Sequence, residues 1–206
     1  MRSAKFLLLC AVPFLSANFA AAQSIDAYLG LGTAMASSNN VPTDTFGDGV
    51  IYYPPRMGGS FLYFGGDFMF SPHLGVGVET SFRTTQGSYA GLNYKPTFYD
   101  FNAVYHPMGG NKRIVPELQA GIGGVNLKFY YNQQYCDTFA GCSTSNTYLE
   151  SSNHFQVHLM AGINFYVKGG FFVRPQVDIR YVNNFFQFGT NWVPEYGAVV
   201  GYSFGH

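Results

Sequence analysis

The sequence predicts an all-β protein: an eight-stranded, antiparallel, up-and-down β-barrel that spans a membrane. Three observations lead to this prediction. Eight segments alternate apolar and polar side chains with a period of two, as strands with different surroundings on their two faces do. The connections between these segments alternate between long and short. Charged residues make up only 11% of the chain and aromatic residues 18%, whereas soluble domains carry about 25% charged residues.

The clearest alternation lies in residues 171–182. One set of alternate side chains is apolar: Phe171, Val173, Pro175, Val177, Ile179 and Tyr181. The other set is polar or charged: Arg174, Gln176, Asp178 and Arg180. A helix would mix the two sets around its circumference, so this segment is predicted to be a strand.

Residues 1–22 are predicted to be a signal peptide and residues 23–206 the barrel domain. Arg2 and Lys5 form a basic start, an apolar run follows, and the small residues 20–22 form a cleavage site. Loss of this segment leaves nine Lys and Arg against eleven Asp and Glu, a net charge of −2. The remaining chain has no basic patch, so we expect no binding to nucleic acid.

The predicted strands and their connections give the topology. The strands cover residues 25–34, 60–70, 74–84, 96–106, 113–130, 154–167, 171–182 and 193–204. Short turns follow at residues 71–73, 107–112 and 168–170. Longer connections, expected to be loops, lie at residues 35–58, 85–95, 132–153 and 183–192. Outer-membrane barrels have an even number of strands, short periplasmic turns and longer outer loops, so both termini are expected on the periplasmic side.

Glycines and aromatic residues indicate which face of each strand meets lipid. The polar face holds nine glycines: Gly30, Gly32, Gly65, Gly75, Gly77, Gly121, Gly123, Gly197 and Gly201. The crowded lumen of an eight-stranded barrel needs such residues, whereas the solvated face of a lipocalin-like barrel does not. The apolar face carries two predicted aromatic girdles: Phe68, Phe70, Tyr105, Phe165, Phe171, Tyr202 and Phe204 near the short turns, and Phe82, Tyr99, Phe155, Tyr181 and Tyr196 near the long loops.

The run Arg-Pro-x-Val-x-Ile-Arg-Tyr at residues 174–181 resembles the penultimate strand of small eight-stranded outer-membrane barrels of the OmpA/OmpX type. The resemblance covers nearly the whole mature chain. It implies a protein embedded in the lipid of the outer membrane of a diderm bacterium. The family usually ends on an aromatic residue, whereas here Gly205 and His206 follow Phe204.

Charged side chains on the predicted inner face form the first candidate site. They are Glu79, Arg83, Asp100, Glu117, Arg174, Asp178, Arg180 and Glu195. A buried unpaired charge costs several kcal/mol, so we expect ion pairs centred on Arg174 and Arg180, with Glu79, Glu117 and Glu195 as partners. Such a cluster is either a structural polar core or a narrow ion path, and the small lumen of eight strands favours the core.

A catalytic site is disfavoured. His158 is expected to face the lumen, where Asp100 or Glu79 would be its neighbour, but no Ser stands in a nucleophile motif. We therefore assign no catalytic residue, no cofactor and no metal.

The two longest connections form the second candidate site. Residues 35–58 and 132–153 are rich in Tyr, Asn, Ser and Thr, which suit surface recognition, although a merely solvated cap has the same composition. In an exported chain, Cys136 and Cys142 are expected to form a disulfide, because two thiolates are too few ligands for zinc. The predicted function is a structural or surface-interaction role for a monomer. A narrow porin-like channel is the alternative, and a lipid- or peptide-acting enzyme is less favoured.

Overall fold

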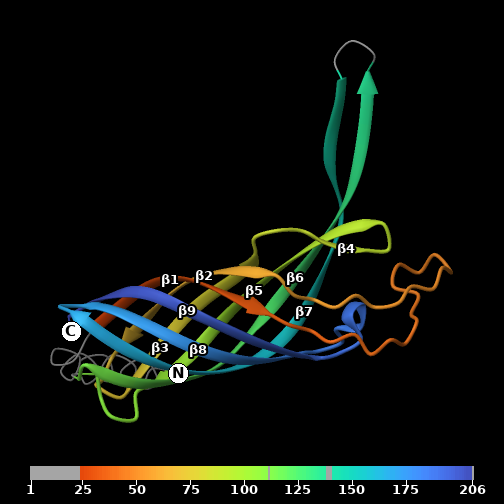
Figure 1. Cartoon of the computed structure of the whole chain (residues 1–206). Coiled ribbons are helices and arrows are strands. Elements are labelled where there is room, and N and C mark those ends of the chain that lie inside the picture. Colours follow the sequence, from red (N-terminus) through yellow and green to blue (C-terminus); the bar gives the residue numbers. More distant parts are fainter. Residues whose placement is uncertain (1–23, 111, 138–140, 206) are drawn as a thin grey trace, which may run out of the picture.

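Eight long strands wind into a barrel in the computed structural model, which describes residues 24–110, 112–137 and 141–205 (Figure 1). The predicted signal peptide lies outside the described residues. The barrel strands are β1 (Ser24–Ala34), β2 (Ser60–Met69), β3 (Leu74–Arg83), β5 (Leu92–Tyr105), β6 (Ile114–Asp137), β7 (Gly141–Lys168), β8 (Phe171–Val182) and β9 (Trp192–Phe204). The short strand β4 (Gly87–Tyr89) and the 3-10 helix η1 (Phe186–Phe188) lie in connections.

The barrel closes completely. Each long strand pairs antiparallel with the next, including β3 with β5, and the first strand β1 pairs with the last strand β9 to close the ring. Ile25 lies opposite Phe204, so the start of β1 and the end of β9 meet at the end with the short turns. The eight-stranded, up-and-down prediction is therefore confirmed. The described part of the chain holds no helix long and apolar enough to cross a bilayer.

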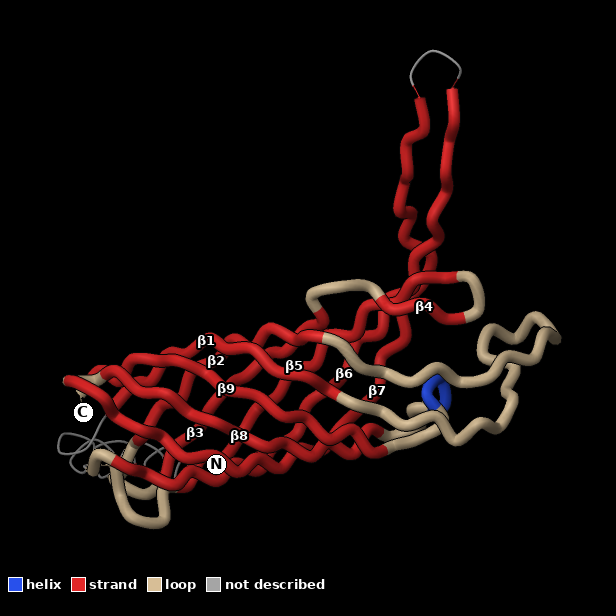
Figure 2. Tube along the Cα trace, in the orientation of Figure 1, coloured by secondary structure: helices blue, strands red, loops and turns tan. Residues whose placement is uncertain are grey.

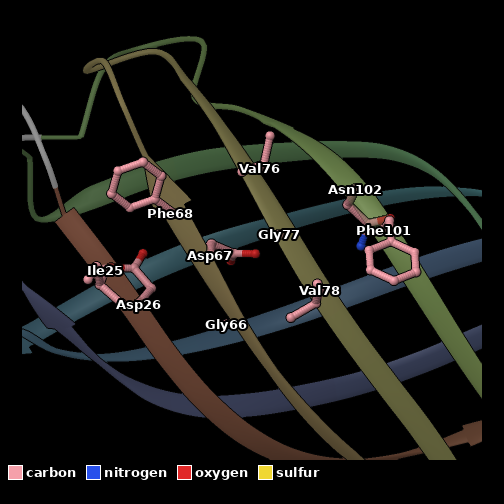
Figure 3. A pocket seen from close by; sticks show the side chains of 10 residues that line it. All are labelled: Ile25, Asp26, Gly66, Asp67, Phe68, Val76, Gly77, Val78, Phe101 and Asn102. Atoms are coloured by element: carbon pink, nitrogen blue, oxygen red, sulfur yellow. The ribbon is translucent and has the colours of Figure 1, made fainter. Parts of the chain in front are cut away.

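The alternation along each strand places apolar side chains outside and polar ones inside. In β8, Phe171 and Ile179 are 62% and 47% exposed, whereas Arg174, Asp178 and Arg180 are buried. This is the reverse of a soluble barrel, and it fits a wall surrounded by lipid. The outer wall is not smooth, because Gly66 leaves a groove of about 550 Å³ bounded by apolar side chains of β1, β2, β3 and β5 (Figure 3). The groove lies on the lipid-facing surface and is open to acyl chains.

The prediction of a loop at residues 132–153 is wrong. β6 and β7 continue their ladder beyond the barrel to the pair Asp137 and Gly141, and form a two-stranded extension that we call the arm (residues 131–137 and 141–148; Figure 2). Two strands already paired in the barrel extend their hydrogen bonding at little further entropic cost, which overrides the loop-like composition. The predicted disulfide between Cys136 and Cys142 joins the strands near the tip, with the Cα atoms 3.9 Å apart.

A β-bulge sets the direction of the arm. Phe129 lies opposite Glu150 and Tyr130 lies opposite Tyr148, so Leu149 is the extra residue. A bulge bends a ribbon and increases its twist. Figures 1 and 2 show the arm leaving the barrel sideways at this point.

The predicted loop at residues 85–95 contains a small hairpin. β4 pairs with the first residues of β5, and the two residues between them, Ala90 and Gly91, have φ of 53° and 79°. Two consecutive positive φ values are typical of the type I′ turn that suits a tight hairpin. The other outer connections are mostly irregular, with isolated bridges between Ala36 and Met57 and between Thr43 and Tyr52.

Candidate functional site: a lumen filled by two layers

Two arginines of β8 form the centre of the polar layer in the lumen. Arg174 and Arg180 are completely buried, and β8 directs both inward because they are an even number of residues apart. The predicted charged residues of β3, β5, β6 and β9 surround them. A buried charge requires partners, and the neighbouring strands supply them.

Arg174 is the central cation in the half of this layer that lies near the short turns. Its guanidinium forms an ion pair with Glu117, lies 3.3 Å from Asp67 Oδ2 and 3.9 Å from Glu79 Oε2, and its Nε donates to Gln176 Oε1 at 3.0 Å. The guanidinium carbon also lies 4.2 Å from the centre of the Tyr28 ring. The arginine is thereby held by carboxylates, an amide and an aromatic face.

Arg180 repeats this arrangement one level towards the outer loops. It pairs with Asp100, and it lies 3.5 Å from Glu79 Oε1 and 3.2 Å from Glu195 Oε1. Glu79 thus contacts both arginines and links the two halves of the layer. One carboxylate oxygen of Glu79 faces Arg174 and the other faces Arg180, so the ion pairs form one connected network.

Several neutral residues of this network carried no prediction as site residues. Amide side chains bridge the carboxylates: Gln119 donates to Glu117 at 2.7 Å, Gln156 to Asp100 at 2.7 Å, and Asn164 to Glu117 at 2.6 Å. Their inward positions follow from the period of two. Which amide reaches which carboxylate depends on the stagger between strands, which the sequence does not display.

The two lumenal histidines each contact a carboxylate. His158 Nε2 lies 2.8 Å from Asp178 Oδ1, and its Nδ1 lies 3.2 Å from Asn102 Oδ1. His158 also lies within electrostatic range of Glu79, one of its two expected neighbours, whereas Asp100 pairs with Arg180. His106 Nε2 lies 3.1 Å from Glu117 Oε2.

Arg83 lies apart from this network. Its guanidinium carbon is 5.2 Å from the centre of the Tyr94 ring, and its nitrogens lie within about 3 Å of where a Cβ on Gly59 would stand. No ion pair joins Arg83 to a described carboxylate. Its inclusion in the lumen cluster was therefore wrong, because the end of β3 lies beside the outer loops rather than in the middle of the lumen.

An apolar layer closes the lumen on the side of the outer loops. Its inward side chains are Phe61, Phe98, Val125, Leu127, Val182 and Val193, all fully buried. The connections complete it, because Phe188 of η1 packs its ring 5.3 Å from that of Tyr94 and 4.7 Å from that of Phe185. This layer was not predicted, although the period of two places its members on the inner face.

The two layers together leave the lumen filled. An ionic network occupies its middle, and a buried aromatic and aliphatic cap covers that network. Within the described ranges, no three His, Cys, Asp or Glu residues are placed to hold a metal ion. The arrangement is suited to holding the barrel rigid.

A closed eight-stranded barrel with an apolar outer wall and a filled polar lumen defines a small barrel protein of the bacterial outer membrane. The chain belongs to the family described as the outer membrane protein beta-barrel domain, whose sequence profile matches residues 7–204. The protein is therefore an integral protein of the outer membrane of Gram-negative bacteria.

Solved structures with the same fold include three bacterial proteins. Ail, the attachment invasion locus protein of Yersinia pestis, has a TM-score of 0.53 at 14% identity, over 89% of this chain and 99% of Ail. Neisserial surface protein A has a TM-score of 0.57 at 14% identity, over 87% and 97% of the two chains. OprG from Pseudomonas aeruginosa has a TM-score of 0.57 at 14% identity, over 90% and 98%. No curated protein sequence matches the chain.

Proposed function

We propose that the protein makes contacts at the cell surface: the closed barrel is a fixed support, and the arm is the element that binds a partner. One observation carries this proposal. The lumen is filled by two layers, whereas the arm extends well clear of the barrel, and its two strands pair with no third strand among those described (Figure 2).

The filled lumen argues against the porin-like alternative. An ion that crosses would have to separate Arg174 and Arg180 from carboxylates that hold them on several sides. It would then have to pass the apolar layer, lined by residues such as Phe61, Leu127 and Phe188. Both steps are costly in a medium of low dielectric.

The edges of the arm suit binding to an extended chain. Pairing of β5 with β6 ends at Tyr130, and pairing of β7 with β8 begins at Gln156. Beyond these points the two arm strands have only each other as ladder partners among the described strands. Natural proteins usually protect such edges with Lys or Pro, but residues 131–136 and 141–148 contain neither. An added strand could extend this two-stranded ladder by pairing along one of its edges.

The side chains of the arm favour a neutral partner. Tyr131 and Tyr148 are 45% and 52% exposed, and the arm has no Lys or Arg. Ail, which has a similar fold, forms a complex with the heparin analogue sucrose octasulfate. A polyanion of that kind requires cations, so we expect this arm to bind through tyrosine rings and hydrogen bonds instead.

Catalysis forms no part of the proposal. His158 is fully engaged with Asp178 and Asn102 inside the filled lumen, out of reach of an external substrate. The proposed role is therefore non-catalytic.

Photocrosslinking in living cells tests the proposal. A photoreactive phenylalanine analogue replaces Tyr131 on the arm in one variant and Tyr53, which is 68% exposed in the connection between β1 and β2, in the control. We expect a discrete adduct at position 131 and none at position 53. The adduct should disappear when cells also produce an excess of the wild-type chain, which competes for the partner. Adducts of equal yield from both positions, or none from position 131, would contradict the proposal.

A further inference from the structure

A small polar pocket lies at the outer end of the barrel, away from the arm. It has a volume of about 300 Å³ and lies between the connection from β1 to β2 and the connection from β8 to β9. Its lining residues are Asn39, Thr43, Asn184, Phe185, Phe186, Gly189, Thr190 and Asn191. Neither the lumen network nor the arm supplies any of them.

The walls of the pocket are fixed before any ligand binds. Asn191 accepts a hydrogen bond from the backbone N–H of Phe185 at 3.1 Å and donates one to the Tyr181 hydroxyl at 3.3 Å. Phe185 is fully buried in the apolar layer, so it anchors this connection to the barrel. Gly189 has φ of 68°, and the Asn39 amide fills the space beside it that a Cβ would need. Because the pocket is already ordered, little of the binding free energy is lost in ordering it.

Several hydrogen-bonding groups remain available at the rim. The Asn39 oxygen accepts from the backbone of Val41 at 2.9 Å, which leaves its NH₂ group to donate. Asn184 is exposed, and its side chain makes no hydrogen bond to the described residues. An amide offers donors and an acceptor close together, which matches the adjacent hydroxyl groups of a sugar.

An aromatic surface lies beside these amides. Phe186 is 37% exposed, and its other side is supported by His154, whose ring centre lies 6.1 Å away. The C–H groups of a pyranose ring pack well on such a surface, because an aromatic ring has a negative face. The pocket contains no Asp, Glu, Lys or Arg, so it has no group to neutralise a charged ligand.

We infer that this pocket binds a neutral sugar residue of a surface glycan. The polar rim excludes a purely apolar ligand, the lack of charge excludes a sulfated or carboxylated sugar, and the single exposed ring provides the stacking surface. This inference goes beyond the proposed function and does not depend on the arm. The sugar can come from the lipopolysaccharide of the same membrane or from a foreign glycan, since both present neutral pyranoses at this surface.

Saturation-transfer NMR on the full chain in lipid nanodiscs tests the inference. The probes are the methyl glycosides of glucose, galactose, mannose and N-acetylglucosamine, with glucose 6-sulfate as the charged comparison. We expect transfer to the ring protons of at least one neutral probe and none to the sulfate. Nanodiscs that contain lipopolysaccharide identify the source: a weaker probe signal there means that lipopolysaccharide sugars occupy the pocket, and an unchanged signal means a foreign glycan.

Two asparagines give a matched pair of variants. Asn184→Gly removes the rim amide and keeps the backbone, because residue 184 has φ of 57° and glycine adopts this conformation freely. Asn40→Gly makes the same change at φ of 55° in the facing connection, outside the pocket lining. We expect Asn184→Gly and Phe186→Ala to lower the affinity for the probe at least tenfold. Asn40→Gly should leave this affinity unchanged. Absence of transfer from all four glycosides, or an unchanged signal in Asn184→Gly, would overturn the inference.

Discussion

The guanidinium of Arg174 lies over the ring of Tyr28, with 4.2 Å between the guanidinium carbon and the ring centre. The same ring lies against Gly65, where a Cβ would stand 2.6 Å from the ring carbon Cζ. Strands β1, β2 and β8 therefore meet in the lumen through a stack of arginine, tyrosine and glycine. A cation over an aromatic ring is stabilised by up to about 2 kcal/mol when water is excluded.

Substitution Gly65→Val should disrupt this stack. Because the added side chain has no room, Tyr28 must leave its place under Arg174, and we expect a loss of at least about 3 kcal/mol, at the upper end of overpacking costs. The urea midpoint, followed by the fluorescence of Trp192, the only tryptophan in the sequence, measures it. Ala27→Val on the outward face of β1 is the control and should leave the midpoint nearly unchanged. Equal losses in the two variants would contradict the packing described here.

Arg180→Met should be more harmful than the same change at Arg83. Removal of Arg180 leaves Asp100, Glu79 and Glu195 without their shared cation, and a broken buried pair costs about 3–5 kcal/mol. Arg83→Met removes only a contact with Tyr94, at a cost of about 1 kcal/mol. The temperature at which the folded band disappears from an unboiled gel reports both losses. The same loss for both variants would mean that the arginine network contributes little to stability.

The wild-type barrel should not conduct ions in planar bilayers, because both layers of the lumen would have to open. Glu117→Gln weakens the ionic layer next to Arg174 but leaves the apolar layer intact, so it too should show no steady current. Single-channel recording at high protein-to-lipid ratio checks this. Discrete current steps in the wild type that change in size with Glu117→Gln would show that the lumen is an ion path.

Cys136→Ser should loosen the arm and leave the barrel unchanged. The disulfide joins two arm residues far from the lumen network, so its loss affects only the local hairpin. We expect faster amide exchange in residues 131–137 and 141–148, and a free energy of unfolding of the barrel, measured with urea, that is unchanged within about 0.5 kcal/mol. Hydrogen exchange with and without reductant on the wild type is the companion measurement. Slow exchange throughout the arm of Cys136→Ser would show that the ladder alone holds it.

The strand count, the strand directions and the identity of the lipid-facing side were predictable, because each depends on a period of two and on the lengths of connections. For the same reason Arg174, Arg180 and Glu117 were predicted to lie in the lumen. A period of two in the sequence shows on which face of a strand a side chain lies, but not how far along the barrel axis it lies. Arg83 was misplaced for that reason, since it lies on the correct strand but beside the outer connections.

The arm could not be predicted from local composition. Residues such as Asn132, Ser145 and Thr147 are frequent in loops, and nothing in their own sequence favours a strand. They are strands because they continue a ladder that the barrel has already set in register. The hydrogen-bond partner of His158 was missed for a related reason: the stagger between β7 and β8 places Asp178, rather than Asp100 or Glu79, within hydrogen-bond distance.

The sideways departure of the arm has a consequence for what the protein can touch. Eight residue pairs, from Tyr130 with Tyr148 to Asp137 with Gly141, lie beyond the bulge, and at about 3.3 Å per residue they extend about 26 Å. Figure 2 shows this length directed away from the side of the barrel rather than along its axis, so the arm extends beyond the barrel wall. Under the proposed role, the arm therefore meets its partner beside the barrel rather than above its mouth.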